Sequence, residues 1–202
     1  MSVLTRVPPS SPDEAPKFVV AGEEEHNEPT ELDIYVKLIG QQLEGVMYHE
    51  SMKGWCQVLG LKGFARMHKH QLCEEFETYL KLKSHYIHET KMLPQPEAYE
   101  FTQTLKGMEA NVNNKQGMYS EWDIVEQTKS MIEHYYKWET KVLKHLVKWK
   151  VYLKDKDMIN EMIENVMCEI KDIETIMRDL DCEGYEYEYI CKVQPYLYHL
   201  YK

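Results

Sequence analysis

Apolar side chains recur every three or four residues along most of this chain, which is the spacing of one face of an α-helix. From Thr30 onward the spacing predicts a first helix that ends near Gln57, and then a second helix from about Lys62 to Lys91. Thr30 is followed by acidic residues in the first turn, so it is a suitable N-cap for the first helix.

The second half of the chain repeats this pattern. A third helix is predicted to begin after the cap residue Ser120 and to extend to about Leu153, with lysines gathered toward its C-terminal end. After Asp157, apolar residues at heptad-like spacing predict a fourth helix that reaches about Leu180.

The connections between these helices predict the topology. Residues 97–120 are rich in Asn and Gly, so we expect a long crossover that contains a short helix around Ala98 to Leu105. The first and last connections are short, and this combination predicts an all-α, up-down four-helix bundle over residues 30–182. Residues 183–202 form a C-terminal tail in which alternating tyrosines, Tyr185 to Tyr189, fit either a strand or a short fifth helix.

Composition narrows the class of protein. The chain of 202 residues is long enough for one domain and an appendage, and its proline-rich, acidic residues 1–29 predict a disordered arm. A net charge of -10 disfavours a nucleic-acid partner. No apolar run approaches the roughly 20 residues that cross a bilayer, and the N-terminus lacks a secretory signal, so we expect no membrane association. Five cysteines without a CxxC pair favour a reducing, cytoplasmic location.

Several short motifs, taken in order, resemble bacterial-type ferritins. They are Trp55-Cys56, Gly60-Leu61-Lys62-Gly63, the double acid Glu74-Glu75 and the closing Leu93-Pro94, with weaker likeness at 124–128 and 169–180. The resemblance implies a ferritin-like four-helix fold. In that family it also implies a homo-oligomeric, hollow cage that oxidises and stores iron.

The chemistry of such a centre can be stated from general principles. Iron(II) prefers carboxylate and imidazole ligands, and two irons that share an oxidant need carboxylates from several helices to converge. In an apolar interior these carboxylates would repel one another unless cations neutralised them. The usual mark is Glu-x-x-His, which sets both ligands on one helix face.

The resemblance assigns metal ligands to specific positions. The glutamate of the first helix falls on Gln42, which offers only an amide oxygen. The glutamate of the second helix is Glu75, but the histidine three residues later is Thr78. The glutamates of the third and fourth helices fall on Glu126 and Glu169. Three carboxylates are few for two divalent irons, so the resemblance implies an altered ferroxidase centre.

Other residues leave alternatives open. His49 lies seven residues after Gln42 on the same helix face, where it serves either as a nitrogen ligand or as a structural histidine that hydrogen-bonds a neighbour. Glu75 and Glu126 are either ligands or solvated glutamates at the edge of an apolar stripe. The histidines of the second helix are explained by exposed polar faces better than by metal contacts; they are His68, His70, His85 and His88.

Two main functions follow from these expectations. One is an iron-binding and iron-storage protein of ferritin type, with iron as its ligand and with Fe(II) oxidation as its only expected enzyme activity. The other is a ferritin-like structural or assembly subunit that has no working iron site and binds no cofactor. A small-molecule oxidoreductase with a two-metal centre is a third possibility, but it needs the ligands that are replaced here.

Overall fold

The computed structural model describes residues 4–6, 18–20, 28–96 and 119–201, and most of these residues are helical. The helices are α1 (Glu31–Val58), α2 (Lys62–Thr90), α4 (Glu121–Trp149), α5 (Asp157–Cys182) and α6 (Tyr187–Leu200), with a short 3-10 helix, η2 (Lys150–Tyr152), after α4. Two short strands, β1 (Leu4–Arg6) and β2 (Phe18–Val20), pair antiparallel.

Two of the long helices begin at reciprocal caps. The Thr30 hydroxyl accepts from the backbone N–H of Asp33 at 3.2 Å, and the Asp33 carboxylate accepts from the N–H of Thr30 at 2.9 Å. Ser120 and Asp123 repeat this arrangement at α4, with distances of 3.2 and 3.0 Å. Each pair satisfies two backbone donors that a helix N-terminus leaves free, which fixes where the helix starts.

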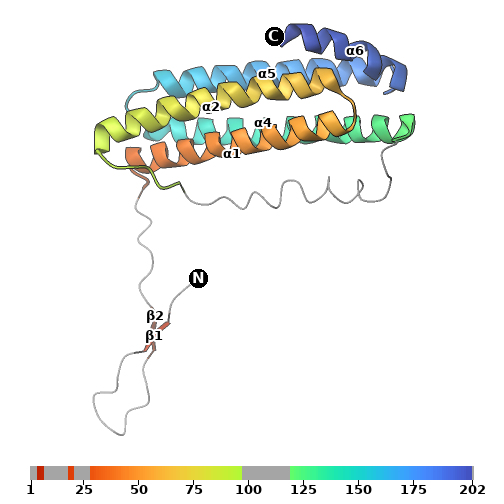
Figure 1. Cartoon of the computed structure of the whole chain (residues 1–202). Coiled ribbons are helices and arrows are strands. Elements are labelled where there is room, and N and C mark those ends of the chain that lie inside the picture. The colour runs from red at the N-terminus through yellow and green to blue at the C-terminus, as the bar shows by residue number, and fades with distance from the viewer. Residues whose placement is uncertain (1–3, 7–17, 21–27, 97–118, 202) are drawn as a thin grey trace, which may run out of the picture.

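The four long helices run side by side as two antiparallel pairs, α1 with α2 and α4 with α5 (Figure 1). The turn between α1 and α2 contains Gly60 at φ +76°, a backbone conformation that favours glycine. The side chains that fill the interior are apolar and almost fully buried; the largest are Tyr48, Phe64, Ile34, Leu38, Ile39, Met52, Leu82, Met131, Leu146, Ile159, Ile173 and Leu180. Their removal from water is the main term that stabilises the bundle.

The C-terminal helix α6 packs against the beginning of α2, near the turn that joins α1 to α2 (Figure 1). Gln194 accepts a hydrogen bond from the backbone N–H of Gly63 through its side-chain oxygen at 2.7 Å. The backbone of Gln194 passes so close to Gly63 that a Cβ at that position would overlap it. Gly63 therefore allows α6 to approach α2, and α6 in turn caps the start of α2.

The structure confirms the all-helical class and the extents of the long helices to within a few residues. The third helix is shorter than predicted because α4 ends at Trp149 and tightens into η2. The alternating tyrosines lead into helix α6 and form no strand. The predicted short helix at Ala98 to Leu105 and most of the arm, residues 1–29, lie outside the described residues; the paired strands of that arm were not predicted. Among the described helices, none is long and apolar enough to span a membrane.

Candidate functional site

Three glutamates from three different helices interact inside the bundle: Glu75 on α2, Glu139 on α4 and Glu169 on α5. The charge of Glu169 raises the pKa of both Glu75 and Glu139, and the charge of Glu75 raises that of Glu139. Glu139 is 0% exposed, and Oε2 of Glu75 is also buried. We refer to Glu75, Glu139 and Glu169 as the carboxyl cluster.

Local sequence explains why two of these acids face inward. Glu139 follows Trp138 in the stripe of α4 that also carries buried Tyr135 and Val142, so the packing of that stripe takes the glutamate into the interior. Glu75 enters the space that Gly45 leaves on α1. A Cβ at position 45 would lie 2.8 Å from Cδ of Glu75, which is closer than packed atoms allow.

The cluster is unevenly supplied with hydrogen bonds. Glu169 accepts from the hydroxyl of Tyr135 at 3.4 Å. With its amide nitrogen turned toward the acids, Gln71 also donates to Glu169 Oε1 at 3.0 Å and to Glu74 Oε2 at 2.9 Å. The protonated carboxyl of Glu139 donates to Glu169. By contrast, Oε2 of Glu75 has no hydrogen-bond partner among the described residues. Buried carboxyl oxygens without partners are unfavourable when charged.

This environment holds the cluster in its neutral form. Burial is the main cause that raises the pKa of Glu75 and of Glu139 well above its ordinary value, and the neighbouring carboxylates add to it. Burial, followed by the charge of Glu74, raises the pKa of Glu169 to about 8. At neutral pH, therefore, the cluster carries protons that a cation would have to displace.

Two buried histidines lie next to the cluster. The Nδ1 atoms of His49 and His68 are 3.1 Å apart, so one of them donates and the other accepts. Burial lowers the pKa of His49 well below its ordinary value and that of His68 to about 3, which keeps both rings neutral. Nε2 of His49 lies 3.6 Å from Glu139 Oε1 and is buried without a hydrogen bond in the described part of the chain. His49 thus presents a nitrogen to the cluster while its other side binds His68.

A cavity of about 30 Å³ lies beside two members of the cluster. Its wall includes Glu75 and Glu169, together with Gln42, Glu74 and Thr78. A space of this size accommodates one water molecule or one ion. The cavity brings together Gln42, Glu75 and Glu169, which are three of the residues that the resemblance assigned as ligands. It also places Thr78, where a histidine was expected, on the same wall.

The structure does not bring Glu126 into this cluster. Glu126 is exposed near the start of α4, whereas Glu139, thirteen residues later on the same helix, is the acid of α4 that is buried with Glu75 and Glu169. The sequence contained a signal for this: Glu139 is a charged residue inside the apolar stripe formed by Tyr135, Trp138, Val142 and Leu146. A lone acid at such a position requires a specific partner or a proton.

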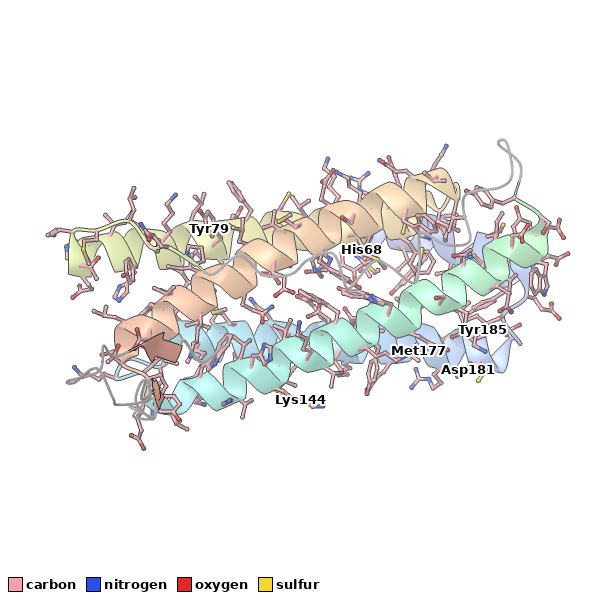
Figure 2. The ribbon with its side chains drawn as sticks, turned by 90° about the horizontal axis from the view of Figure 1, so that it is seen from below. His68, Tyr79, Lys144, Met177, Asp181 and Tyr185 are labelled. Carbon is pink, nitrogen blue, oxygen red and sulfur yellow. The ribbon has the colours of Figure 1, made fainter. Side chains whose placement is uncertain are left out.

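The histidines of α2 divide into two groups. The expectation that all of them lie on exposed faces is wrong for His68, which is only 2% exposed and points toward the interior beside His49 (Figure 2). His88 is exposed, and His70 lies 3.4 Å from Glu74 at the surface. Two residues that donate to Glu169, Gln71 and Tyr135, carried no expectation from the sequence, because polar and aromatic residues are common on any amphipathic helix.

Comparison with known proteins and with metal-site geometry adds three negative findings. No protein-family model matches the chain, and no curated protein is significantly similar to it. Within the described residues, no three His, Cys, Asp or Glu side chains are already arranged around one point as metal ligands. What the cluster offers is a set of acids from separate helices, beside which one oxygen of Glu75 and one nitrogen of His49 are buried without a hydrogen bond among the described residues.

Proposed function

We propose that this protein binds iron(II) at the carboxyl cluster and belongs functionally with the iron-storage proteins of ferritin type. The observation that carries the proposal is the meeting of acids from α2 and α5 at a cavity of about 30 Å³, with the buried Glu139 of α4 hydrogen-bonded to one of them, Glu169. Carboxylate oxygens and imidazole nitrogens from separate helices of a bundle are the ligands that iron(II) prefers.

Each residue has a stated part in this proposal. Glu75 and Glu169 would supply carboxylate oxygens at the cavity, and the neutral amide oxygen of Gln42 would add a weaker donor. Glu139 and Nε2 of His49 would supply an oxygen and a nitrogen from the adjoining side. Because these acids are neutral at rest, they must release their protons and turn toward the cation as it enters.

The replaced ligands limit the chemistry that we assign. Gln42 and Thr78 line the cavity where the resemblance expects an acid and a histidine, so the site has fewer charged ligands than two irons require. We therefore propose binding and storage as the function, with slow Fe(II) oxidation at most. The same replacements favour a second candidate, a ferritin-like subunit that keeps the fold for assembly and whose neutral acids are only a buried polar core.

Assembly and location are also part of the proposal. Large apolar side chains remain exposed on α4, η2 and α5, including Trp122 at 70%, Val151 at 71% and Met167 at 56%. Exposed apolar surface of this kind is commonly covered by a second subunit, which supports a homo-oligomer and leaves a ferritin-type cage as its expected form. All five cysteines are free thiols, which fits a reducing, cytoplasmic location.

The test is an anaerobic titration of the chelator-treated protein with Fe(II), in which isothermal calorimetry measures the heat of binding. Glu139→Gln and Glu169→Gln each remove one carboxylate of the cluster with little change in shape, and Glu126→Gln removes an exposed one from α4. We expect saturable binding in the wild-type protein. Each cluster variant should weaken it at least tenfold, whereas Glu126→Gln should leave it unchanged.

The opposite pattern would identify the correct alternative. Loss of binding in Glu126→Gln but not in Glu139→Gln would mean that α4 contributes the ligand predicted from the family resemblance. No binding in any variant or in the wild-type protein would support the structural subunit instead. The protein with bound Fe(II) is then exposed to air, and absorbance shows whether the bound Fe(II) is oxidised faster than Fe(II) in buffer alone.

A further inference from the structure

A second site lies away from the carboxyl cluster, where the end of α1, the beginning of α2 and α6 meet. A pocket of about 310 Å³ opens there, and four of its lining residues are cationic: Lys53, Lys62, Arg66 and Lys69. No described acidic residue lines it, although the chain has 34 acids and a net charge of -10. A pocket of one charge sign on a protein of the opposite sign concentrates the field that attracts an anion.

Helix geometry explains how the charges come together. Lys62, Arg66 and Lys69 are spaced four and three residues apart, so they project from one face of α2. Lys53 approaches from α1 and is ion-paired with Glu50, which offsets part of its charge. In the described part of the chain, Lys62 and Lys69 have no ion-pair partner, so their charges are available to a ligand.

Arg66 is held in position by α6. Its Nε donates to the backbone carbonyl of Tyr201 at 2.6 Å, and its guanidinium lies 4.3 Å from the centre of the Tyr198 ring. These two contacts use Nε and one face of the guanidinium, so the terminal NH2 groups remain for a ligand. An arginine fixed in this way loses little freedom on binding, and its planar fork matches the oxygens of a phosphate.

We propose that this pocket binds the phosphate group of a small phosphorylated molecule. Three or four cations suit a dianion better than a single carboxylate, and the volume matches the lower end of small-ligand sites. Tyr198 forms an aromatic wall on which the rest of such a molecule can rest. The proposal does not depend on iron binding, because none of these residues belongs to the carboxyl cluster.

The experiment is calorimetric titration of the full chain, in low-salt buffer with EDTA, using inorganic phosphate, pyrophosphate and adenosine triphosphate separately. EDTA prevents metal-bound phosphate from contributing. Lys69→Gln and Arg66→Gln each remove one cation of the pocket. Lys144→Gln is the matched control, since Lys144 is exposed among other lysines on the outer side of α4 (Figure 2), where no other helix contributes to the cationic surface.

We expect saturable binding of at least one of the three probes, with an affinity that falls about tenfold or more in Lys69→Gln and Arg66→Gln and stays unchanged in Lys144→Gln. Equal affinity for all three probes would assign free phosphate as the ligand, whereas preference for the nucleotide would assign a phosphorylated organic molecule. Because Arg66→Gln also releases α6, Lys69→Gln is the decisive variant. The proposal is overturned by absence of saturable binding at millimolar concentrations, or by equal losses in Lys69→Gln and Lys144→Gln, which would mean general attraction of anions to lysines.

Discussion

Replacing Glu169 by glutamine should stabilise the metal-free protein at neutral pH while it weakens cation binding. The pKa of Glu169 rises from 4.5 in the unfolded chain to about 8 in the folded protein. At a pH below 4.5, the carboxyl is protonated in both the folded and the unfolded chain, so the raised pKa does not affect stability there. Between pH 4.5 and 8, however, the folded state keeps a proton that the unfolded state has released, so stability falls as pH rises through this window.

The magnitude follows from that window. At pH 7.5 the gap of about 3 pH units corresponds to an upper limit of about 4 kcal/mol, at 1.36 kcal/mol per unit. Because the residue is partly exposed, we halve this value, to about 2 kcal/mol. Glutamine mimics the neutral acid and retains an oxygen that can accept from Tyr135. Glu169→Gln should therefore unfold about 4–8 °C higher than the wild-type protein at pH 7.5.

The assay is scanning calorimetry of both proteins in EDTA at half-unit steps from pH 5 to pH 8, with Glu126→Gln as a control that removes an exposed acid. The gap between Glu169→Gln and the wild-type protein should widen steadily as pH rises and be less than about 1 kcal/mol at pH 5. The prediction is wrong if the free energy of unfolding falls equally with pH in both proteins, or if Glu169→Gln differs from the wild-type protein no more than Glu126→Gln does. Either result would show that burial does not hold this carboxyl neutral.

Three other predictions follow from packing, and one from proton release. Gly45→Ala should change the free energy of unfolding by less than about 1 kcal/mol in urea unfolding, because the new methyl group meets only the flexible end of Glu75, which can shift, and because alanine favours the helix. Gly63→Ala should detach α6 through its overlap with the backbone of Gln194, which limited proteolysis detects as early cleavage of the C-terminal helix. Leu146→Ala, at a fully buried position, should lower the unfolding free energy by about 3 kcal/mol in the same urea assay. Binding of Mn(II) at pH 7 should release protons, measured as a dependence of the calorimetric heat on the ionisation heat of the buffer.

The helices could be predicted from sequence because their signals are local. The apolar period and the caps Thr30 and Ser120 each act within a few residues, and they locate the starts of α1 and α4 correctly. The sequence does not decide between a strand and a helix for the C-terminal segment, because its alternating tyrosines fit both structures. Its contact with Gly63 comes from a distant part of the chain and leaves no periodic mark.

Three of the residues assigned from the resemblance, Gln42, Glu75 and Glu169, line the cavity, whereas the residue assigned on α4 does not. Gln42 and Glu75 belong to helices joined by a tight turn, so their relative heights are fixed, and both line the cavity. The position of α4 along the bundle axis, relative to α1 and α2, depends on a long crossover, and the length of that crossover does not determine which residues of α4 lie beside Glu75. The resulting choice of Glu126 over Glu139 is an offset of about 20 Å along a helix, far more than one turn.

The acids of the carboxyl cluster should destabilise the metal-free protein and stabilise the metal-bound protein. Each of the three acids lowers the free energy of unfolding at neutral pH, because the folded protein holds it in the protonated form. Glutamine or leucine would fit the same positions without this cost, so selection for stability alone does not explain the acids. Neutral acids that release protons when a cation enters make the same residues stabilising in the bound state, since binding to the folded form alone raises its stability. If the cluster serves a cation, Mn(II) at pH 7.5 should therefore reverse the order of stability, raising the unfolding temperature of the wild-type protein above that of Glu169→Gln. A stability order that stayed the same with and without the metal would assign the acids to a structural polar core.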